Sequence, residues 1–427
     1  MSEASWVLTV GFLVLMVLGV PVVFSLGLSS LIALWLLDID VVILAQRVIA
    51  GTQSFPLLAV PGFILAGELM TQGGLSTRLI QVADRLVRHV RGGLGMVSVL
   101  SSMFFACISG SAPATTATVG SIMIPEMLKR GYSKRFAASL AVCVGPLGQI
   151  IPPSIPFIVW GVIAEVSVSR LFLSGVIPGV LCGCGYMLVC YLMARKYKLP
   201  TMPRATAREF GQALGDGKWA ILAPVIILGG IYGGIFTPTE AAMVGVVYGL
   251  VVGLFIYRGL KVGGLYALIL KSMSTTAIVM FIIAVASVFG WLLAYEQVPD
   301  KIVSGILAVS DNKFVILILL NVVLLIVGAF MDNLAAMIIL GGLLMKLGEQ
   351  LGIDPVQLGA IVVINFAVGM ETPPFGYSLF VGSAISGLSI EDISKGMFPF
   401  FLVDVAMLLL VTYVPWATLW LGKLILG

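Results

Sequence analysis

Long apolar runs fill most of this chain, and many of them reach the ~20 residues that a helix needs to cross a lipid bilayer. Hydrophobic residues make up 60% of the sequence and charged residues only 10%, whereas soluble domains carry roughly a quarter charged residues. These runs predict an all-α polytopic membrane protein that lies in the bilayer. The net charge of +4 is small and does not indicate nucleic acid as a partner.

Two stretches of the sequence coincide when one is shifted by 221 positions. The coinciding pairs are Ser111 and Asp332, Gly131 and Gly352, Gly148 and Gly369, Pro152-Pro153 and Pro373-Pro374, Gly175 and Gly396, and Pro178 and Pro399. A register that holds without gaps from 111 to 178 is difficult to obtain by chance. We interpret it as an internal duplication, and the breaks inside it as the working site.

The two copies predict two structural repeats with the same order of elements. The first repeat, 1–194, is expected to contain scaffold spans in 6–70, an arm helix at 75–91, a hairpin at 94–128, a broken helix at 134–165 and a span at 172–194. A polar linker, 195–218, leads to the second repeat, 219–427, with scaffold spans in 219–295, an arm at 298–309, a hairpin at 314–348, a broken helix at 355–386 and a span at 397–422. Each repeat makes five crossings, and because five is odd the repeats are inverted relative to each other.

The arm and the hairpin that follows it have patterns unlike those of simple spans. In the arm, apolar residues recur at helical spacing on one face and arginines occupy the other, which is typical of a helix in the membrane interface. The segments 94–108 and 113–128 are short for spans, and the small polar turn Ser109-Gly110-Ser111 joins them. Basic residues flank both outer ends, which favours a re-entrant hairpin that returns to the side it entered.

Loop charges predict the orientation of the chain. Basic residues concentrate in the first arm, in 129–135, in the linker and at 258–261, whereas the alternate loops carry mostly acids. Since cytoplasmic loops are enriched in Lys and Arg, we expect both termini to be periplasmic. The first hairpin then enters from the cytoplasm and the second from the outside.

The breaks predict a central cavity. In hydrocarbon every backbone N–H and C=O needs an internal partner, so an irregular backbone survives only where it lines a cavity. Half-helix N-termini attract anions, and unwound carbonyl groups offer oxygen ligands to a cation such as Na⁺. This layout is typical of secondary transporters with a site near the membrane midplane.

The sequence resembles the large membrane (M-type) subunit of the tripartite ATP-independent periplasmic (TRAP) transporters over its whole length. The motifs that carry the resemblance are Ser109-Gly110-Ser111-Ala112-Pro113-Ala114-Thr115, Met123-Ile124-Pro125-Glu126-Met127 with Arg130-Gly131-Tyr132, Ile151-Pro152-Pro153-Ser154, Met331-Asp332 and Glu371-Thr372-Pro373-Pro374-Phe375-Gly376. The resemblance implies Na⁺-driven import of an organic acid, of the C4-dicarboxylate or sialic acid class, across a bacterial inner membrane. It also implies an elevator-like movement, a four-helix small membrane subunit and a periplasmic binding protein that delivers the substrate.

The candidate site residues lie at the breaks. Substrate is expected at Ser109, Ser111, Ser154, Asp332 and Thr372, and Na⁺ at Ser109, Gly110, Ser111, Gly145, Gly148, Asp332, Asn333, Gly369, Glu371 and Thr372. Two breaks predict two or more ions, with neither ATP nor an organic cofactor. No arginine lies in the predicted core, so anion binding would rest on helix dipoles and bound Na⁺.

Each of these residue types also has a structural interpretation. The serines and glycines would allow tight turns or close packing, and Glu371 would form a buried pair in the scaffold. Asp332 would cap the helix that begins at Asn333, although an acid at this depth is a functional hypothesis by default. Glu240 is a secondary candidate because Thr237-Pro238-Thr239-Glu240 fits a capping box.

Three alternative functions make different predictions. An intramembrane hydrolase would need a base for its serine, yet the only histidine, His89, lies in the first arm, so we expect no enzyme. An ATP-driven permease would depend on a separate ATPase, because this chain contains no G-x-x-x-x-G-K-[ST] motif. A stand-alone Na⁺/carboxylate symporter would transport without a binding protein.

Overall fold

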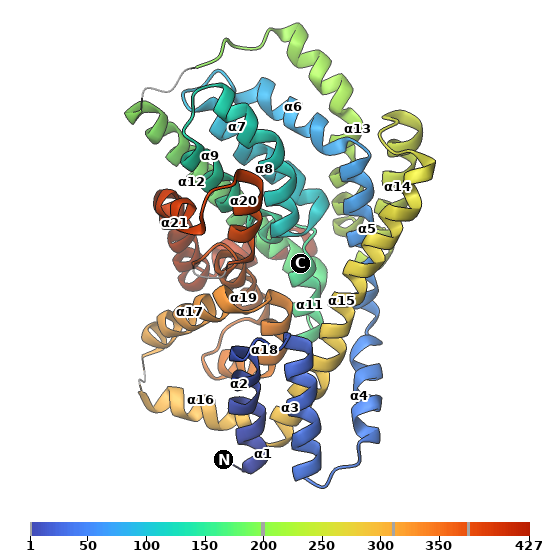
Figure 1. The fold of residues 1–427 in the computed structure, drawn as a ribbon, viewed down its shortest axis with the longest axis vertical. Coiled ribbons are helices and arrows are strands. Elements are labelled where there is room, and N and C mark those ends of the chain that lie inside the picture. The colour runs from blue at the N-terminus through green and yellow to red at the C-terminus, as the bar shows by residue number, and fades with distance from the viewer. Residues whose placement is uncertain (1, 198–200, 310–311, 374–375) are drawn as a thin grey trace.

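The computed structural model describes residues 2–197, 201–309, 312–373 and 376–427, and these residues form helices joined by turns (Figure 1). Seven of the described helices are long and apolar enough to cross a membrane, or eight if the bent pair Lys134–Ile150 and Ile155–Ile163 counts as one span. The predicted all-α membrane protein is confirmed. Pro374 and Phe375, which belong to the second proline motif, lie outside the described residues.

The first part of the chain follows the predicted order of spans, arm, hairpin and broken helix. Its elements are α1 Glu3–Trp6, η1 Val7–Gly11, α2 Phe12–Val17, α3 Val22–Leu36, α4 Val42–Thr52, η2 Phe55–Leu58, α5 Ala59–Gln72, α6 Leu75–Val87, α7 Gly93–Ser109, α8 Ala112–Lys129, α9 Lys134–Cys143, α10 Leu147–Ile150, α11 Ile155–Ile163 and α12 Val168–Lys196.

The second part repeats this order. Its elements are α13 Ala207–Tyr232, α14 Pro238–Val251, η3 Val252–Ile256, α15 Val262–Tyr295, α16 Val298–Val309, α17 Lys313–Phe330, α18 Asn333–Gln350, α19 Pro355–Gly369, α20 Tyr377–Ser386, α21 Ile390–Tyr413 and α22 Trp416–Leu426.

Helix bounds in the two parts share the 221-residue register found in the sequence. Helix α8 runs from Ala112 to Lys129 and α18 from Asn333 to Gln350, so both bounds differ by 221 positions. The starts of α9 and α19, Lys134 and Pro355, differ by the same number. The inverted orientation of the two parts stays a prediction.

Prolines and helix caps shift several bounds from those predicted. The expected third span at 48–70 is divided, because α4 ends at Thr52 and a new helical segment begins at Phe55 with Pro56 in its first turn. The last span is divided in the same way at Pro415. Helix α13 begins inside the expected linker, where Thr206 and Glu209 form a capping box.

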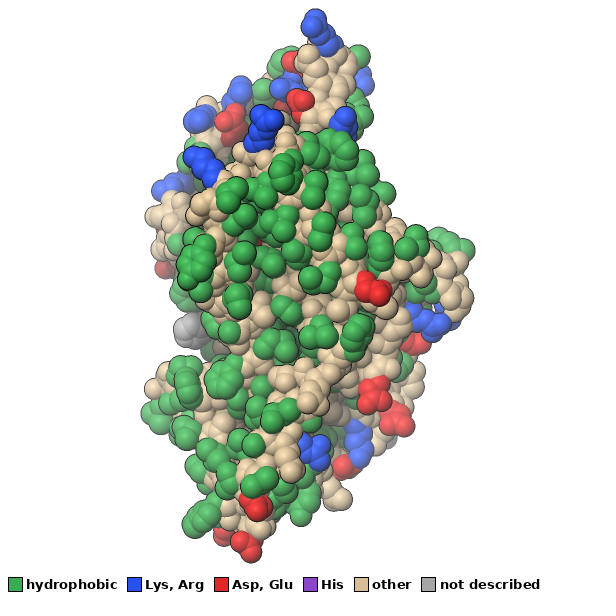
Figure 2. Space-filling model, turned by 90° about the vertical axis from the view of Figure 1, so that its right-hand side faces the viewer, with side chains coloured by type: hydrophobic (Ala, Val, Ile, Leu, Met, Phe, Trp, Pro, Cys, Tyr) green, Lys and Arg blue, Asp and Glu red, His purple; other side chains and the backbone are tan. Residues whose placement is uncertain are grey.

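Two bodies share the membrane region. In one, α5 packs on α14 and α15 packs on α3, α4 and α5, and Figure 1 shows α15 crossing most of the height of the molecule beside them. The other contains the hairpins and broken helices, in which α8 packs on α9 and α20, and α17 packs on α19. Figure 2 shows a broad apolar face on the side of α14 and α15, with Lys and Arg gathered toward one end.

Candidate functional site

A cavity of about 560 Å³ lies where the two hairpin tips meet the long helices α5 and α15. It is lined by the first tip and the second tip, by one residue from each broken helix, and by polar residues of α5 and α15. The residues used below are Ser109, Gly110, Ser111, Asp332, Asn333, Gln149, Met370, Glu68 and Lys271. The cavity therefore joins segments that are far apart in sequence.

The first tip is held by hydroxyl groups and by a glycine turn. Gly110 has φ +61°, and a Cβ there would lie 2.9 Å from Pro153 O, so the turn needs glycine. Thr115 Oγ1 donates to Ser111 O at 2.9 Å and lies 3.0 Å from Ser109 Oγ. Since the Thr115 hydroxyl proton is used on Ser111, Ser109 is the donor to Thr115.

The first helix break packs directly under this tip. A Cβ at Gly145 would lie 2.2 Å from Thr116 Oγ1, and a Cβ at Gly148 would lie 2.3 Å from Thr115 Oγ1. Glycine is thus needed at both positions for the two segments to touch. Thr116 Oγ1 is buried and has no partner among the described residues. Tip and break together concentrate hydroxyl and carbonyl oxygens, the ligand type that hard cations prefer.

The second tip is built around Asp332 and Asn333. Asp332 Oδ1 accepts hydrogen bonds from the backbone N–H groups of Leu334 at 3.0 Å and Ala335 at 3.3 Å, so Asp332 caps α18. Its side chain nevertheless remains exposed and lines the cavity. Asp332 therefore combines the structural and the functional roles that the sequence offered as alternatives.

The second break is in contact with its own hairpin. A Cβ at Gly369 would lie 2.7 Å from the carbonyl carbon of Gly328 in α17. Thr372 Oγ1 donates to Val368 O at 2.8 Å, inside the same broken helix. Gly369 and Thr372 lie behind the cavity and do not line it.

Gln149 joins the two halves of the site. Asn333 Nδ2 donates to Gln149 Oε1 at 2.8 Å, and Gln149 Nε2 donates to Met370 Sδ at 3.4 Å. One side chain from the first break thus contacts both the tip and the break of the second half. Gln149 was not among the residues expected from the sequence.

The predicted site residues divide into three groups. The cavity brings together Ser109, Gly110, Ser111, Asp332 and Asn333, while Gly145, Gly148, Ser154, Gly369 and Thr372 lie behind it. Ser154 Oγ is buried without a partner among the described residues. Glu371 and Glu240 are directed elsewhere.

Glu371 is fully buried, and its carboxyl group faces that of Asp404 in α21. Asp404 Oδ1 accepts a hydrogen bond from the Tyr186 hydroxyl group of α12. Glu240 closes the capping box with Thr237, which accepts from Glu240 N at 3.2 Å while Glu240 Oε2 accepts from Thr237 N at 2.8 Å. Glu371 forms a buried acid pair, and Glu240 has the structural role foreseen for it.

Sequence reasoning missed a charged pair on the cavity wall. Lys271 Nζ of α15 lies 2.8 Å from Glu68 Oε1 of α5, and Gln72 Nε2 donates to Glu68 Oε2 at 3.3 Å. Lys271 is the only basic residue among the described residues that line the cavity. It is also the only charged residue in the 34-residue helix α15, and an isolated intramembrane charge was the available signal.

Three helices begin at the cavity wall. Their first residues or caps there are Ser111 and Pro113 for α8, Asn333 and Leu334 for α18, and Ile155 and Pro156 for α11. A helix N-terminus carries partial positive charge and unpaired N–H groups. The arrangement can therefore hold an anion in the cavity and cations at the oxygen-rich breaks.

Comparison with known proteins identifies similar chains. The family model described as tripartite ATP-independent periplasmic transporter, DctM component, matches residues 9–417. The chain is 42% identical to the isethionate TRAP transporter permease protein DctMQ of Oleidesulfovibrio alaskensis, covering 95% of this chain and 64% of that one. It therefore spans about two thirds of that relative.

Two further relatives match over almost their full length. They are the C4-dicarboxylate large permease protein DctM of Pseudomonas aeruginosa (42% identity, 93% of this chain and 94% of that one) and the sialic acid large permease protein SiaM of Vibrio cholerae (37%, 98% and 98%). Among solved structures, the YdaH transporter of Alcanivorax borkumensis has a similar fold, with a TM-score of 0.64, 16% identity and 87% of each chain covered.

Proposed function

Because the chain belongs to the DctM component family of the tripartite ATP-independent periplasmic (TRAP) transporters, we propose that it carries an organic acid across the membrane through the cavity between its hairpin tips. The observation that carries the proposal is the convergence of three helix N-termini and Lys271 on one cavity. An anion in this cavity gains from the helix dipoles and from the single basic side chain.

The substrate class follows from the same chemistry. The relatives are named for C4-dicarboxylates, sialic acid and isethionate, which are all organic anions. A carboxylate bound near the start of α8 or α18 would accept backbone hydrogen bonds, and Lys271 would balance part of its charge. We assign the substrate to the C4-dicarboxylate or sialic acid class.

Na⁺ is the proposed coupling ion. Ser109, Ser111 and the backbone at Gly145 and Gly148 supply oxygen atoms around the first break, and the backbone at Gly369 with Thr372 supplies them around the second. Two breaks account for at least two ions. Asp332 adds the only carboxylate at a hairpin tip that faces the cavity.

Movement of one body against the other is the proposed transport step. The hairpins and broken helices form one packed unit, whereas α5 and α15 form the opposite wall. Sliding the first unit along this wall would carry the cavity between the two membrane faces, with α6 and α16 as arms. This is an elevator-like mechanism, and it needs no ATP.

The proposed assembly has two further components in a bacterial inner membrane. A four-helix small subunit would join this chain in the bilayer, and a periplasmic binding protein would deliver the substrate. One relative is named DctMQ and is longer than this chain, which agrees with a fusion of two membrane components. Both termini of this chain are placed on the periplasmic side by its loop charges.

The decisive experiment is uptake into proteoliposomes that contain this chain with its small subunit. We expect uptake only with an inward Na⁺ gradient and with the substrate-loaded binding protein on the outside. Uptake that proceeds equally well in K⁺ would overturn the Na⁺ coupling. Uptake by this chain alone would instead identify a stand-alone symporter, and uptake that needs ATP would exclude a secondary transporter.

A further inference from the structure

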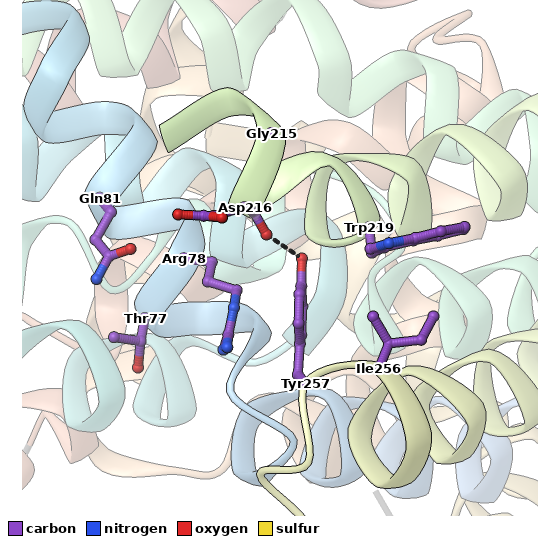
Figure 3. Close-up of a pocket in the computed structure, with 8 residues that line it drawn as sticks. All are labelled: Thr77, Arg78, Gln81, Gly215, Asp216, Trp219, Ile256 and Tyr257. Carbon is purple, nitrogen blue, oxygen red and sulfur yellow. Dashed lines mark hydrogen bonds between the residues drawn. The ribbon is translucent and has the colours of Figure 1, made fainter. Parts of the chain in front are cut away.

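A second pocket lies away from the transport cavity, between the arm helix α6, the helix α13 and the segment that ends η3 (Figure 3). Its volume is about 580 Å³. Thr77, Arg78 and Gln81 line it from α6, Gly215, Asp216 and Trp219 from α13, and Ile256 and Tyr257 from η3 and its C-terminal end. None of these residues has a part in the site described above.

Arg78 is held in one position on the wall of this pocket. Its guanidinium carbon lies 3.7 Å from the centroid of the Tyr257 ring, and Nη1 donates to Gly74 O at 2.9 Å. Tyr257 is itself fixed, because its hydroxyl donates to Asp216 O at 2.7 Å and accepts from Ala220 N at 3.2 Å. Arg78 forms no ion pair with any described residue, so its remaining N–H groups are available to an anion.

Asp216 supplies an opposite charge in the same pocket. Figure 3 shows its carboxylate directed across the pocket toward α6, on the side of Gln81 and Arg78. Asp216 and Arg78 nevertheless are not paired with each other, and Asp216 has no other ion pair within the described part of the chain. Two fixed, opposite and unpaired charges in one pocket fit a ligand that carries both charges.

The pocket lies at the level where the membrane surface is expected. Helix α13 is polar up to Lys218 and apolar beyond Trp219, and Trp and Tyr are enriched at this boundary in membrane proteins. The neighbouring surface is apolar and open, with Phe255 71% exposed and Leu222 40% exposed. A molecule with a polar end in the pocket could place a hydrocarbon end along this surface.

We infer that this pocket binds a phospholipid whose headgroup carries a phosphate and a primary ammonium. The phosphate accepts hydrogen bonds from Arg78 and from Gln81 and Thr77 beside it on α6. The ammonium pairs with the Asp216 carboxylate across the pocket. The acyl chains leave past Ile256 and Trp219 to the exposed apolar surface.

Such a lipid would fasten the arm to the scaffold. The two helices already approach closely, since a Cβ at Gly217 would lie 2.7 Å from Val82 Cγ2. A headgroup bonded to Arg78 on α6 and to Asp216 on α13 adds a polar link at the membrane surface. The arm leads directly into the α7–α8 hairpin, so the link would fix the base from which that hairpin extends.

Thermal unfolding of the full chain, delipidated in detergent, tests the proposal. Phosphatidylethanolamine, phosphatidylglycerol and inorganic phosphate are added separately, and the shift of the melting temperature is measured for each. We expect phosphatidylethanolamine to stabilise the protein at lower concentration than phosphatidylglycerol and inorganic phosphate to have no effect. Equal stabilisation by inorganic phosphate would show a soluble-anion site and overturn the lipid assignment.

Two variants and a control separate the charges. Asp216→Asn should lose the preference for phosphatidylethanolamine while still responding to both lipids, and Arg78→Gln should need roughly tenfold more of either lipid. Arg208→Gln removes a basic residue of α13 outside the pocket and should behave as the parent. A parent-like preference in Asp216→Asn, or a parent-like response in Arg78→Gln, would contradict the proposed headgroup contacts.

Discussion

Gln149 and Met370 are in contact, with Gln149 Nε2 3.4 Å from Met370 Sδ, and they are separated by 221 positions. This is the same separation that relates the two copies in the sequence. A two-fold operation that exchanges the copies also exchanges these two residues, so their contact must lie close to its axis. The proposed symmetry axis therefore passes beside the cavity, where one copy supplies an amide and the other a thioether.

Replacing Gln149 should impair transport more than replacing its partner. In Gln149→Leu the buried Asn333 amide loses its acceptor at the cavity wall, which costs about 1–3 kcal/mol. Met370→Leu conserves volume and should cost less than ~1.5 kcal/mol. Uptake into proteoliposomes should fall roughly tenfold or more for the first variant and stay near the parent for the second. Equal uptake by both variants would contradict a role for the Gln149 bridge.

Asp332 offers a way to separate helix capping from charge. Asp332→Asn keeps a side-chain oxygen for the N–H groups of Leu334 and Ala335, whereas Asp332→Ala removes the cap at a cost of about 1 kcal/mol. If the carboxylate binds Na⁺ or substrate, both variants lose Na⁺-driven uptake while only Asp332→Ala melts at a lower temperature. Ser111→Ala should also lose uptake and keep its assembly with the small subunit. Normal uptake by Asp332→Asn would leave Asp332 as a cap only.

The sequence was sufficient to predict the frame of the site. Backbone breaks in apolar runs have few structural explanations, so Ser109-Gly110-Ser111 and Met331-Asp332 were correctly assigned as helix-to-helix turns. The class of fold followed from composition for the same reason. The direction in which a side chain points was not predictable: Glu371 lies at the second break, but its carboxyl is turned away from the cavity toward Asp404.

The missed residues belong to contacts between distant segments. Glu68 and Lys271 are about 200 positions apart, and nothing in either local pattern shows that their helices share a wall. Lys271 alone was detectable as an isolated charge in an apolar helix. Gln149 was overlooked because its partner Asn333 comes from the other copy, and pairing across copies depends on how they pack.

Lys271 should determine the affinity for the anion. In Lys271→Gln the cavity loses its basic side chain, so the KM for substrate should rise roughly tenfold, the usual effect of losing a charge-assisted hydrogen bond. Lys271→Arg should keep most of the affinity, and Glu68→Gln frees Lys271 from its partner and should not raise KM. An unchanged KM together with a lower melting temperature in Lys271→Gln would mean that the pair only joins α5 to α15.

Glu296 predicts a pH-dependent attachment of the N-terminal helix. Hydroxyl groups of Ser2 and Ser5 donate to its carboxylate and lower the pKa of Glu296. Because the pKa is lower in the folded state, this stabilisation is present above the ordinary glutamate pKa of about 4.3 and is lost as the pH falls. Hydrogen-exchange protection of α1 and η1, corrected for the intrinsic rate, should therefore decrease from pH 7 toward pH 4. In Glu296→Gln the protection should be lower and nearly independent of pH over this range.

The buried pair of Glu371 and Asp404 tests whether Glu371 is a cation ligand. No donor from the described residues reaches either Glu371 oxygen, while Asp404 Oδ1 accepts from Tyr186. Two facing carboxyl groups hydrogen-bond only if one carries a proton, and an amide in place of one of them supplies the missing donor. Glu371→Gln should therefore keep the parent melting temperature and the parent Na⁺ dependence of uptake. Asp404→Leu leaves Tyr186 and Glu371 without partners and should lose about 1–3 kcal/mol or more of stability. A weaker Na⁺ dependence in Glu371→Gln, measured with unchanged stability, would return Glu371 to the cation site.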